Sequence, residues 1–135
     1  MPVSIPKPEF AKVRAIGTDL LDSQRIAQSL NRHGLRLARR ILTATELELW
    51  HSRNDSANFL AKQFAAKEAL AKALGTGIAQ GVGFQQMEVL RDELGAPVVQ
   101  LYGQAAARLT ELGAQKALLS LSDEGDWVLA FAVLS

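Results

Sequence analysis

The sequence predicts a single α+β domain in which mostly antiparallel strands pack with one long central helix. Helical patterns occupy most of the first half of the chain, whereas the second half reads mainly as short strands separated by turns. The long helix is residues 57–74, which contain no Gly or Pro and many strong helix formers. Residues 127–134, WVLAFAVL, form a strand that is apolar on both faces, so we expect it to be central in a sheet or buried in an interface.

The composition indicates one ordinary soluble domain. With 135 residues, 48% of them hydrophobic and 21% charged, the chain is long enough for a real core. The net charge of +1 gives no strong overall field, so we expect neither nucleic acid nor a membrane as a partner. There is no cysteine, which excludes disulfides, thiolate metal sites and a cysteine nucleophile. No apolar run approaches about 18 residues, and the cytoplasm is the expected location.

Residues 1–12 are predicted to be a loose lead-in and residues 13–135 the folded domain, because closely spaced prolines near the start disfavour regular pairing. The lead-in lacks the apolar stretch of a signal peptide. Residues 13–21 read as the first strand. Gly17 inside it indicates close backbone approach by a ligand or a neighbouring element. Asp19 either caps the turn into the next helix or, if buried, is paired, hydrogen-bonded or metal-bound.

A helix is predicted next, capped by Asp22 or Ser23, running to about Asn31 and closed by His33-Gly34. Five arginines on or just after it make a local basic patch on a nearly neutral chain: Arg25, Arg32, Arg36, Arg39 and Arg40. Such a patch suits an acidic partner. A scatter of ordinary surface arginines is the alternative.

Capping and turn signals define the other elements. Thr43 to Glu46 is a capping box that opens a short helix carrying Trp50, and Asn54-Asp55-Ser56 caps the long helix. The later elements are predicted as strand 84–91, strand 98–102, helix 103–112 and the closing strands 117–122 and 127–134.

Charged side chains flank the core-facing stripe of the long helix. At about 100° per residue, Lys67 and Glu68 fall on either side of the stripe that contains Phe64. The simplest interpretation is an ordinary charged flank with a Glu68–Lys72 pair four residues apart. The glycine-rich loop at residues 75–77 could also offer backbone N–H groups to phosphate oxygens.

Three segments resemble the holo-acyl-carrier-protein synthases, a family of 4′-phosphopantetheinyl transferases. Residues 16–26, from Ile16-Gly17-Thr18-Asp19 to Arg25-Ile26, are similar to the N-terminal G-x-D motif of that family. Residues 64–77, FAAKEALAKALGTG, match every fixed position of its second motif, F-x-x-K-E-A-x-x-K-A-x-G-T-G. Residues 119–133 resemble its closing hairpin, but Ser122-Asp123 stands where many members have a Ser-His pair, so no histidine role is carried over.

The resemblance, which covers the chain from residue 13 onward, implies the 4′-phosphopantetheinyl transferase fold and a holo-acyl-carrier-protein synthase. Such an enzyme moves the phosphopantetheine arm of coenzyme A to a serine of apo-acyl carrier protein, releases adenosine 3′,5′-bisphosphate and supports fatty acid biosynthesis. The resemblance also implies a homotrimer with sites between subunits, and Mg²⁺ held by Asp19 and Glu68, which are the expected catalytic residues. The side chains or backbone expected to contact coenzyme A are those of Lys67, Lys72, Gly75, Thr76 and Gly77. The arginines expected to dock the acidic carrier protein are Arg25, Arg32 and Arg36.

The chemistry of these residues agrees with that assignment. Phosphoryl transfer depends on neutralising phosphate charge, and Mg²⁺ is commonly held by one or two carboxylates together with substrate phosphates. The attacking serine would belong to the partner, and its proton would pass to Glu68 or through a metal-bound water. The sequence leaves both routes open. The alternative function is a non-catalytic oligomer that binds acidic helical proteins through the arginines, although such a module needs no pair of apposed acids.

Overall fold

The computed structural model of this protein describes residues 12–135, and residues 1–11 of the predicted lead-in lie outside the described residues. The described residues form helices and antiparallel strands, which confirms the predicted α+β class. In chain order the elements are β1 (Ala15–Asp22), α1 (Ser23–His33), α2 (Leu35–Ile41), α3 (Ala44–Ser52), α4 (Ala57–Leu74), the 3₁₀ turn η1 (Phe84–Gln86), β2 (Met87–Arg91), β3 (Pro97–Leu101), α5 (Gly103–Glu111), β4 (Ala117–Glu124) and β5 (Trp127–Leu134).

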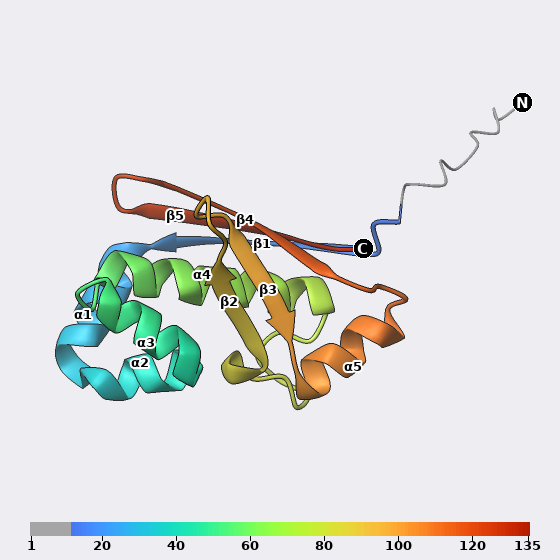
Figure 1. The fold of residues 1–135 in the computed structure, drawn as a ribbon, viewed down its shortest axis with the longest axis horizontal. Coiled ribbons are helices and arrows are strands. Elements are labelled where there is room, and N and C mark those ends of the chain that lie inside the picture. The colour runs from blue at the N-terminus through green and yellow to red at the C-terminus, as the bar shows by residue number, and fades with distance from the viewer. Residues whose placement is uncertain (1–11) are drawn as a thin grey trace, which may run out of the picture.

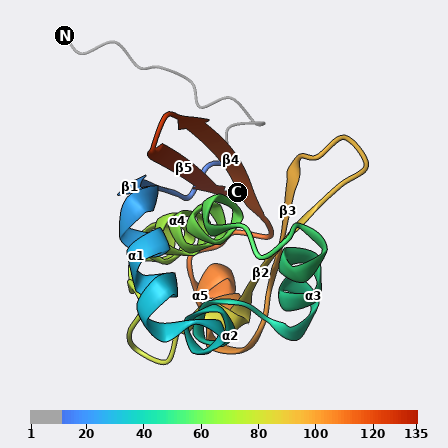
Figure 2. The same cartoon turned by 90° about the vertical axis from the view of Figure 1, so that its left-hand side faces the viewer.

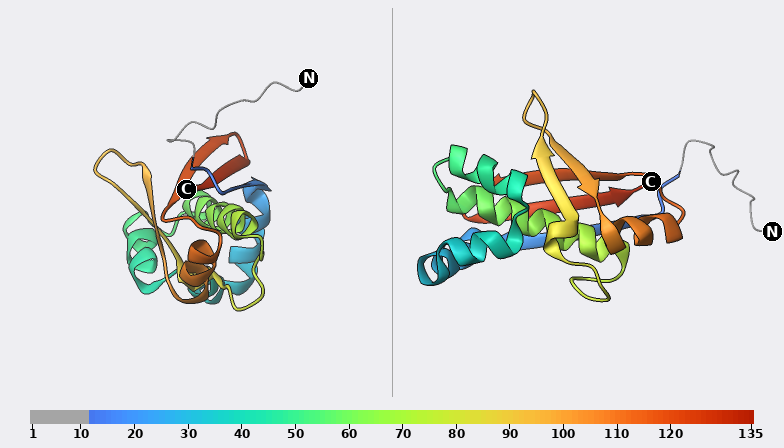
Figure 3. Two further views of the ribbon diagram at one scale, coloured as in Figure 1. Left: turned by 90° about the vertical axis from the view of Figure 1, so that its right-hand side faces the viewer. Right: turned by 60° about the horizontal axis from the view of Figure 1, so that its bottom comes forward.

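Strands β1, β5 and β4 form one antiparallel sheet in that order, so the doubly apolar strand β5 is central, as predicted. The first and last strands of the chain are therefore neighbours, with Gly17 opposite Ala132 and Asp19 opposite Ala130. Strands β2 and β3 form a separate hairpin that projects away from the helices (Figure 3). Helix α4 runs beneath the three-stranded sheet, with α1, α2 and α3 gathered near its N-terminal end and α5 near the other (Figure 1).

The sheet and α4 approach each other closely because small residues line their contact. A Cβ atom added at Gly17 would lie 2.1 Å from the carbonyl oxygen of Ala69 and 2.6 Å from the backbone nitrogen of Ala73. The neighbouring element expected at Gly17 is therefore α4. Across the same layer, β5 contributes the buried residues Ala130 and Ala132. Strand β1 and helix α4 are thus held at backbone-to-backbone distance, which brings their side-chain functional groups together.

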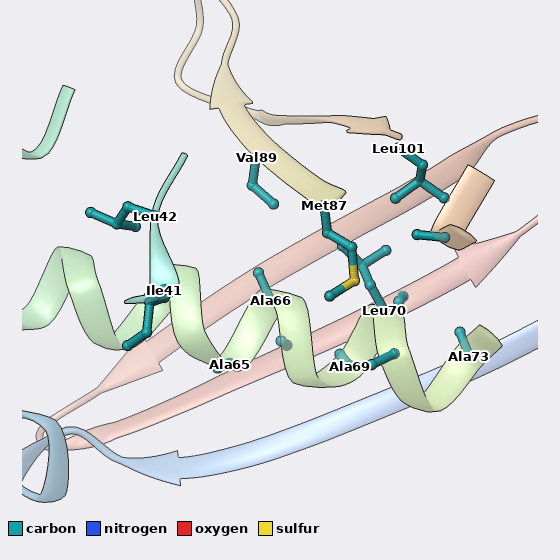
Figure 4. Packing of buried hydrophobic residues seen from close by; sticks show 14 of the residues in the cluster. Ile41, Leu42, Ala65, Ala66, Ala69, Leu70, Ala73, Met87, Val89 and Leu101 are labelled. Carbon is teal, nitrogen blue, oxygen red and sulfur yellow. The ribbon is translucent and has the colours of Figure 1, made fainter. Parts of the chain in front are cut away.

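The opposite side of α4 is covered by the β2–β3 hairpin and by the end of α2, so the helix is buried on nearly every face (Figure 2). Met87 and Val89 of β2 direct their side chains toward α4, and Met87 meets Leu70 (Figure 4). Such all-round burial differs from the single apolar stripe expected from the sequence. It also means that polar residues of α4 must find partners inside the protein.

The structure adds one helix that the sequence did not predict, and it shortens one predicted strand. Helix α2 is not predicted from the sequence, because its arginines mask the three-residue spacing of Ala38 and Ile41, both of which are buried. The predicted strand 84–91 begins only at Met87, since Phe84–Gln86 forms a 3₁₀ turn. The side chain of Gln86 stabilises that turn, donating to the carbonyl of Gly81 and accepting from the backbone N–H of Ala105.

The outer face of the three-stranded sheet is apolar and exposed. Within residues 12–135, no helix or strand covers it (Figures 1 and 2). Its exposed apolar residues are Ile16, Leu20, Leu118, Trp127, Leu129 and Phe131, and we call this set the outer sheet face. An exposed apolar patch of this kind on a folded domain typically marks an interaction surface. Separately, none of the helices in this part of the chain combines the length and apolarity needed to cross a bilayer.

Candidate active site

Strand β1 places Asp19 on the sheet face that packs against α4. Successive side chains of a strand point to opposite faces, so Asp19 faces inward while Leu20 belongs to the outer sheet face. The Asp19 side chain is 15% exposed to solvent. It is not the N-cap of the following helix, because Asp22 fills that position by accepting from the backbone N–H of Gln24 at 2.9 Å. The capping alternative for Asp19 is therefore wrong.

Glu68 of α4 lies close enough to Asp19 for their charges to interact. Partial burial raises the pKa of the Glu68 carboxyl, and the negative charge of Asp19 raises it further, while Lys72 opposes the shift. Asp19 and Glu68 are thus brought together from distant parts of the chain, as expected. Two carboxylates close enough for their charges to interact, in a partly buried setting, favour a shared cation or a shared proton.

Lys72 lies at the solvent-facing rim of this acidic pair. Its Nζ donates to the carbonyl oxygen of Thr18 at 3.0 Å and to Oδ1 of Asp19 at 3.1 Å. In the ordinary-flank interpretation Lys72 would pair with Glu68, but it bonds to β1 instead. Its side chain keeps 53% of its exposure, so the ammonium remains accessible to an anionic ligand beside Asp19.

The expected contact between Lys67 and coenzyme A phosphates is wrong. The Lys67 side chain is completely buried, and its ammonium donates to Oε1 of Glu46 at 2.6 Å, the carbonyl of Ile41 at 2.7 Å and the carbonyl of Phe84 at 3.1 Å. Burial lowers the pKa of Lys67, and the adjacent Glu46 carboxylate opposes that change. Its three protons are all engaged inside the protein, so none is free for a phosphate.

The backbone N–H groups of the glycine-rich loop are also engaged. Gly75 caps α4 in the left-handed conformation with φ 78°, and its N–H points back at the helix. The N–H groups of Thr76 and Gly77 donate to the carbonyl of Ala71 at 3.3 and 3.1 Å. These amides satisfy the end of the helix and are not free donors for a phosphate, whereas contact of Gly75, Thr76 or Gly77 with coenzyme A through other atoms stays a prediction. The C-terminal end of a helix also carries partial negative charge, which disfavours an anion there.

A cavity of about 410 Å³ opens beside Glu68. Its charged lining groups are the Glu68 carboxylate and the Arg40 guanidinium. The apolar lining side chains come from α2, α4, the loop after α4 and η1: Leu37, Ile41, Phe64, Ile78 and Phe84. Arg40 belongs to the basic patch but was not among the arginines selected from the sequence. Arg36 and Arg40 are four residues apart on α2, and that helical spacing is the signal that could have found it.

The basic patch is continuous with this cavity. Arg25, Arg32 and Arg36 are all exposed on α1 and α2. A second cavity, between α1 and α2, is lined by Arg36, Leu37 and Arg40, of which Leu37 and Arg40 also line the cavity beside Glu68. Arg36 is thus the predicted docking arginine that this shared wall connects to Glu68, whereas Arg25 and Arg32 line neither cavity.

A second basic recess lies elsewhere on the domain. The guanidiniums of Arg53 and Arg91 both lie over the ring of Phe59, at 4.9 and 5.1 Å from its centroid. Lys62 lines the same recess, and its Nζ pairs with Asp123 at 3.2 Å. Asp123, which stands where many members of the resembled family have histidine, is thus one half of an ion pair in this chain.

The described part of the chain offers a metal ion two acids at this site. Among residues 12–135 there is no cluster of three or more His, Cys, Asp or Glu side chains that could enclose a metal by themselves. The interacting carboxylates of Asp19 and Glu68 fit Mg²⁺ by their chemistry, because it takes oxygen ligands and commonly completes its coordination with water and substrate phosphates.

Sequence comparison relates the chain to one family. The family described as the 4′-phosphopantetheinyl transferase superfamily matches residues 15–132. The chain is 48% identical over 122 residues to a holo-acyl-carrier-protein synthase of Shewanella amazonensis, a match that covers 90% of this chain and 98% of the relative.

Solved structures agree. The holo-acyl-carrier-protein synthase of Neisseria meningitidis superposes with a TM-score of 0.82 at 44% identity, covering 91% of this chain and 98% of that one. The Helicobacter pylori holo-acyl-carrier-protein synthase, solved in complex with coenzyme A, superposes with a TM-score of 0.78 at 27% identity, covering 89% and 99%.

Proposed function

Because this chain belongs to the 4′-phosphopantetheinyl transferase superfamily, among the holo-acyl-carrier-protein synthases, we propose that it transfers phosphopantetheine from coenzyme A to apo-acyl carrier protein. In this reaction a serine oxygen of the carrier forms a bond to the phosphorus that bears the pantetheine arm. The bond from that phosphorus to adenosine 3′,5′-bisphosphate breaks, and the serine proton leaves to a base. The single observation that supports this chemistry most directly is the charge interaction between Asp19 and Glu68, together with the open cavity that Glu68 lines.

Asp19 and Glu68 are the residues that would hold Mg²⁺. When bound there, the cation neutralises the charge of the pyrophosphate. The chain's own contribution is to hold two carboxylates against each other through the close contact of β1 with α4. This arrangement costs electrostatic repulsion in the free protein, which a divalent cation would relieve.

Lys72 and Glu68 are the residues that would handle phosphate charge and the proton. The half-exposed Lys72 ammonium next to Asp19 would contact a coenzyme A phosphate. Glu68 is the carboxylate of this chain that would accept the serine proton, because it lines the open cavity.

The carrier protein would dock on α1 and α2. Arg25, Arg32 and Arg36 are exposed there, and the described structure gives none of them an acidic partner within 4.0 Å. Acyl carrier proteins are acidic, so complementary charge would favour their approach to this side of the cavity. The serine of the bound carrier would then reach Glu68 past the wall formed by Leu37 and Arg40.

We further propose that the protein is a cytoplasmic homotrimer that supplies carrier protein for fatty acid biosynthesis. The outer sheet face supports assembly, because it exposes apolar side chains from all three strands of the sheet. Association through that face would bury Trp127, Leu129 and Phe131, which are the central strand's contribution to it.

The test is to incubate the protein with coenzyme A, Mg²⁺ and an apo-acyl carrier protein and to follow the carrier by intact mass spectrometry. We expect the carrier to gain one phosphopantetheine group, and Asp19→Asn or Glu68→Gln to abolish the gain without unfolding the protein. Glu93→Gln, at the exposed tip of the β2–β3 hairpin, is the matched control and should remain active. A wild-type protein that binds the carrier but never modifies it would instead support a non-catalytic binding module.

A further inference from the structure

The buried carboxylate of Glu46 in α3 is the centre of a polar cluster inside the protein. Its Oε1 accepts from the backbone N–H of Thr43 at 2.8 Å and from Lys67 at 2.6 Å. Its Oε2 accepts from Nε2 of Gln63 at 2.6 Å and from the backbone N–H of Val89 at 2.9 Å. A carboxylate with four donors is fully satisfied, which is the condition for burying a charge without a large penalty.

Lys67 connects this cluster to the walls of the cavity beside Glu68. Besides Glu46, its ammonium binds the carbonyls of Ile41, at the end of α2, and of Phe84, at the start of η1. Both Ile41 and Phe84 line that cavity. They come from segments more than forty residues apart in the sequence, and Lys67 Nζ joins them at a single atom. Lys67 is also the immediate neighbour of Glu68 in α4, so the same bonds fix the helix at the turn that carries the acid.

We propose that Lys67 and Glu46 are positioning residues, which hold the Glu68 carboxylate and the cavity walls around it in the arrangement that turnover requires. Neither residue contacts substrate, because both are completely buried. The inference rests on the transferase function proposed above. Lys72 bonds instead to Thr18 and Asp19 of β1, and neither Asp19 nor Lys72 shares a hydrogen bond with the cluster. Coenzyme A binding should therefore depend less on the cluster than turnover does.

Two variants separate positioning from plain stability. Lys67→Met removes the ammonium and leaves Glu46 as an unpaired buried charge, so it should be much less stable than the wild type. Combining it with Glu46→Gln removes that charge as well. The double variant should recover much of the stability lost in the single one, but it cannot restore the bonds to Ile41 and Phe84.

The experiment measures urea unfolding, calorimetric binding of coenzyme A, and kcat and KM for carrier modification. We expect the double variant to keep coenzyme A affinity and KM within about threefold, and to lose at least about tenfold in kcat, as misplacement of a reacting group does. Leu109→Ala, a buried truncation in α5 away from the site, is the control and should lose stability while kcat stays unchanged. If the double variant does not fold, Glu46→Asp, which keeps the charge but shortens its reach, should show a smaller loss in kcat.

A folded double variant, or a folded Glu46→Asp variant, with wild-type kcat would overturn the proposal, because the pair would then serve stability alone. A rise in KM for coenzyme A with unchanged kcat would also overturn it, because the cluster would then shape binding. A wild-type protein without transferase activity is a separate result, and it would contradict the proposed function itself.

Discussion

Replacing Gly17 by Ala should disrupt the contact that brings the two acids together. The added Cβ would lie 2.1 and 2.6 Å from two backbone atoms of α4, whereas ordinary contacts of a Cβ begin at 3.4 Å. Neither backbone atom can rotate away, so β1 and α4 must separate by roughly 1 Å. Overpacking usually costs about 1–3 kcal/mol, and because both obstacles here are backbone we expect a loss of about 3 kcal/mol or more.

The same displacement should affect catalysis beyond the loss of folded protein. The obstructing atoms belong to Ala69 and Ala73, which directly follow Glu68 and Lys72, and Gly17 lies two residues before Asp19. A misplacement of about 1 Å can lower a rate by about 100-fold. The assays are urea unfolding and carrier modification at a temperature where the variant is still folded.

A glycine with free space around it provides the control for Gly17→Ala. Gly83 has φ −127° and no atom within 4 Å of an added Cβ. Gly83→Ala should therefore be neutral or stabilise by up to about 1 kcal/mol, because Ala restricts the unfolded chain. A Gly17→Ala protein with wild-type unfolding free energy and wild-type rate would refute the reasoning.

Three further predictions concern charge and assembly. Glu68→Gln removes a negative charge that interacts with Asp19, so without Mg²⁺ the variant should be more stable to urea than the wild type. Because the folded-state pKa of Glu68 is raised, this gain should be absent below the ordinary glutamate pKa and should grow as the pH rises through the raised pKa. A difference in unfolding free energy that does not depend on pH would contradict this. Arg25→Glu should weaken carrier binding on the order of tenfold at low salt and leave coenzyme A affinity unchanged, both measured by calorimetry. Lys116→Glu, a charge reversal at another exposed lysine, is the control and should bind the carrier as the wild type does. If the protein is the proposed homotrimer, Phe131→Glu should convert it to monomers in sedimentation, and a trimer mass in the variant would exclude the outer sheet face as the interface.

Local sequence signals predicted most of the elements because their causes are local. The capping box at Thr43 and Glu46 is present with both of its hydrogen bonds, and Ser56 caps α4 through its side chain. Gly75 ends that helix in the left-handed conformation. Helix α2 escaped prediction because its short apolar face is interrupted by arginines, and a seven-residue helix stabilised by packing has little local signal.

The candidate site was predictable in part. The approach of Asp19 to Glu68 followed from the resemblance to a family, since nothing local links residues so far apart in the chain. The burial of Lys67 could not be predicted in the same way. Its partners Glu46, Ile41 and Phe84 are set by tertiary packing, and a lysine in a matched phosphate-enzyme motif is naturally interpreted as a phosphate ligand. The position of Lys67 around the axis of α4 did place its side chain away from bulk water. Helical geometry alone, however, cannot distinguish a side chain that lines a cleft from one that lies in the core.

The pairing of β1 with β5 has a consequence for the order of events on the ribosome. Asp19 is among the first residues of the domain to be synthesised, yet in the described sheet the strand that carries it pairs with β5, the last strand, and with no other strand. Until translation reaches that strand, β1 has no neighbour to fix its register, and the carboxylates cannot be held across from each other. Helices α1 to α4 can form earlier from nearby contacts, so a nascent chain would acquire its helical layer well before it could bind a divalent cation.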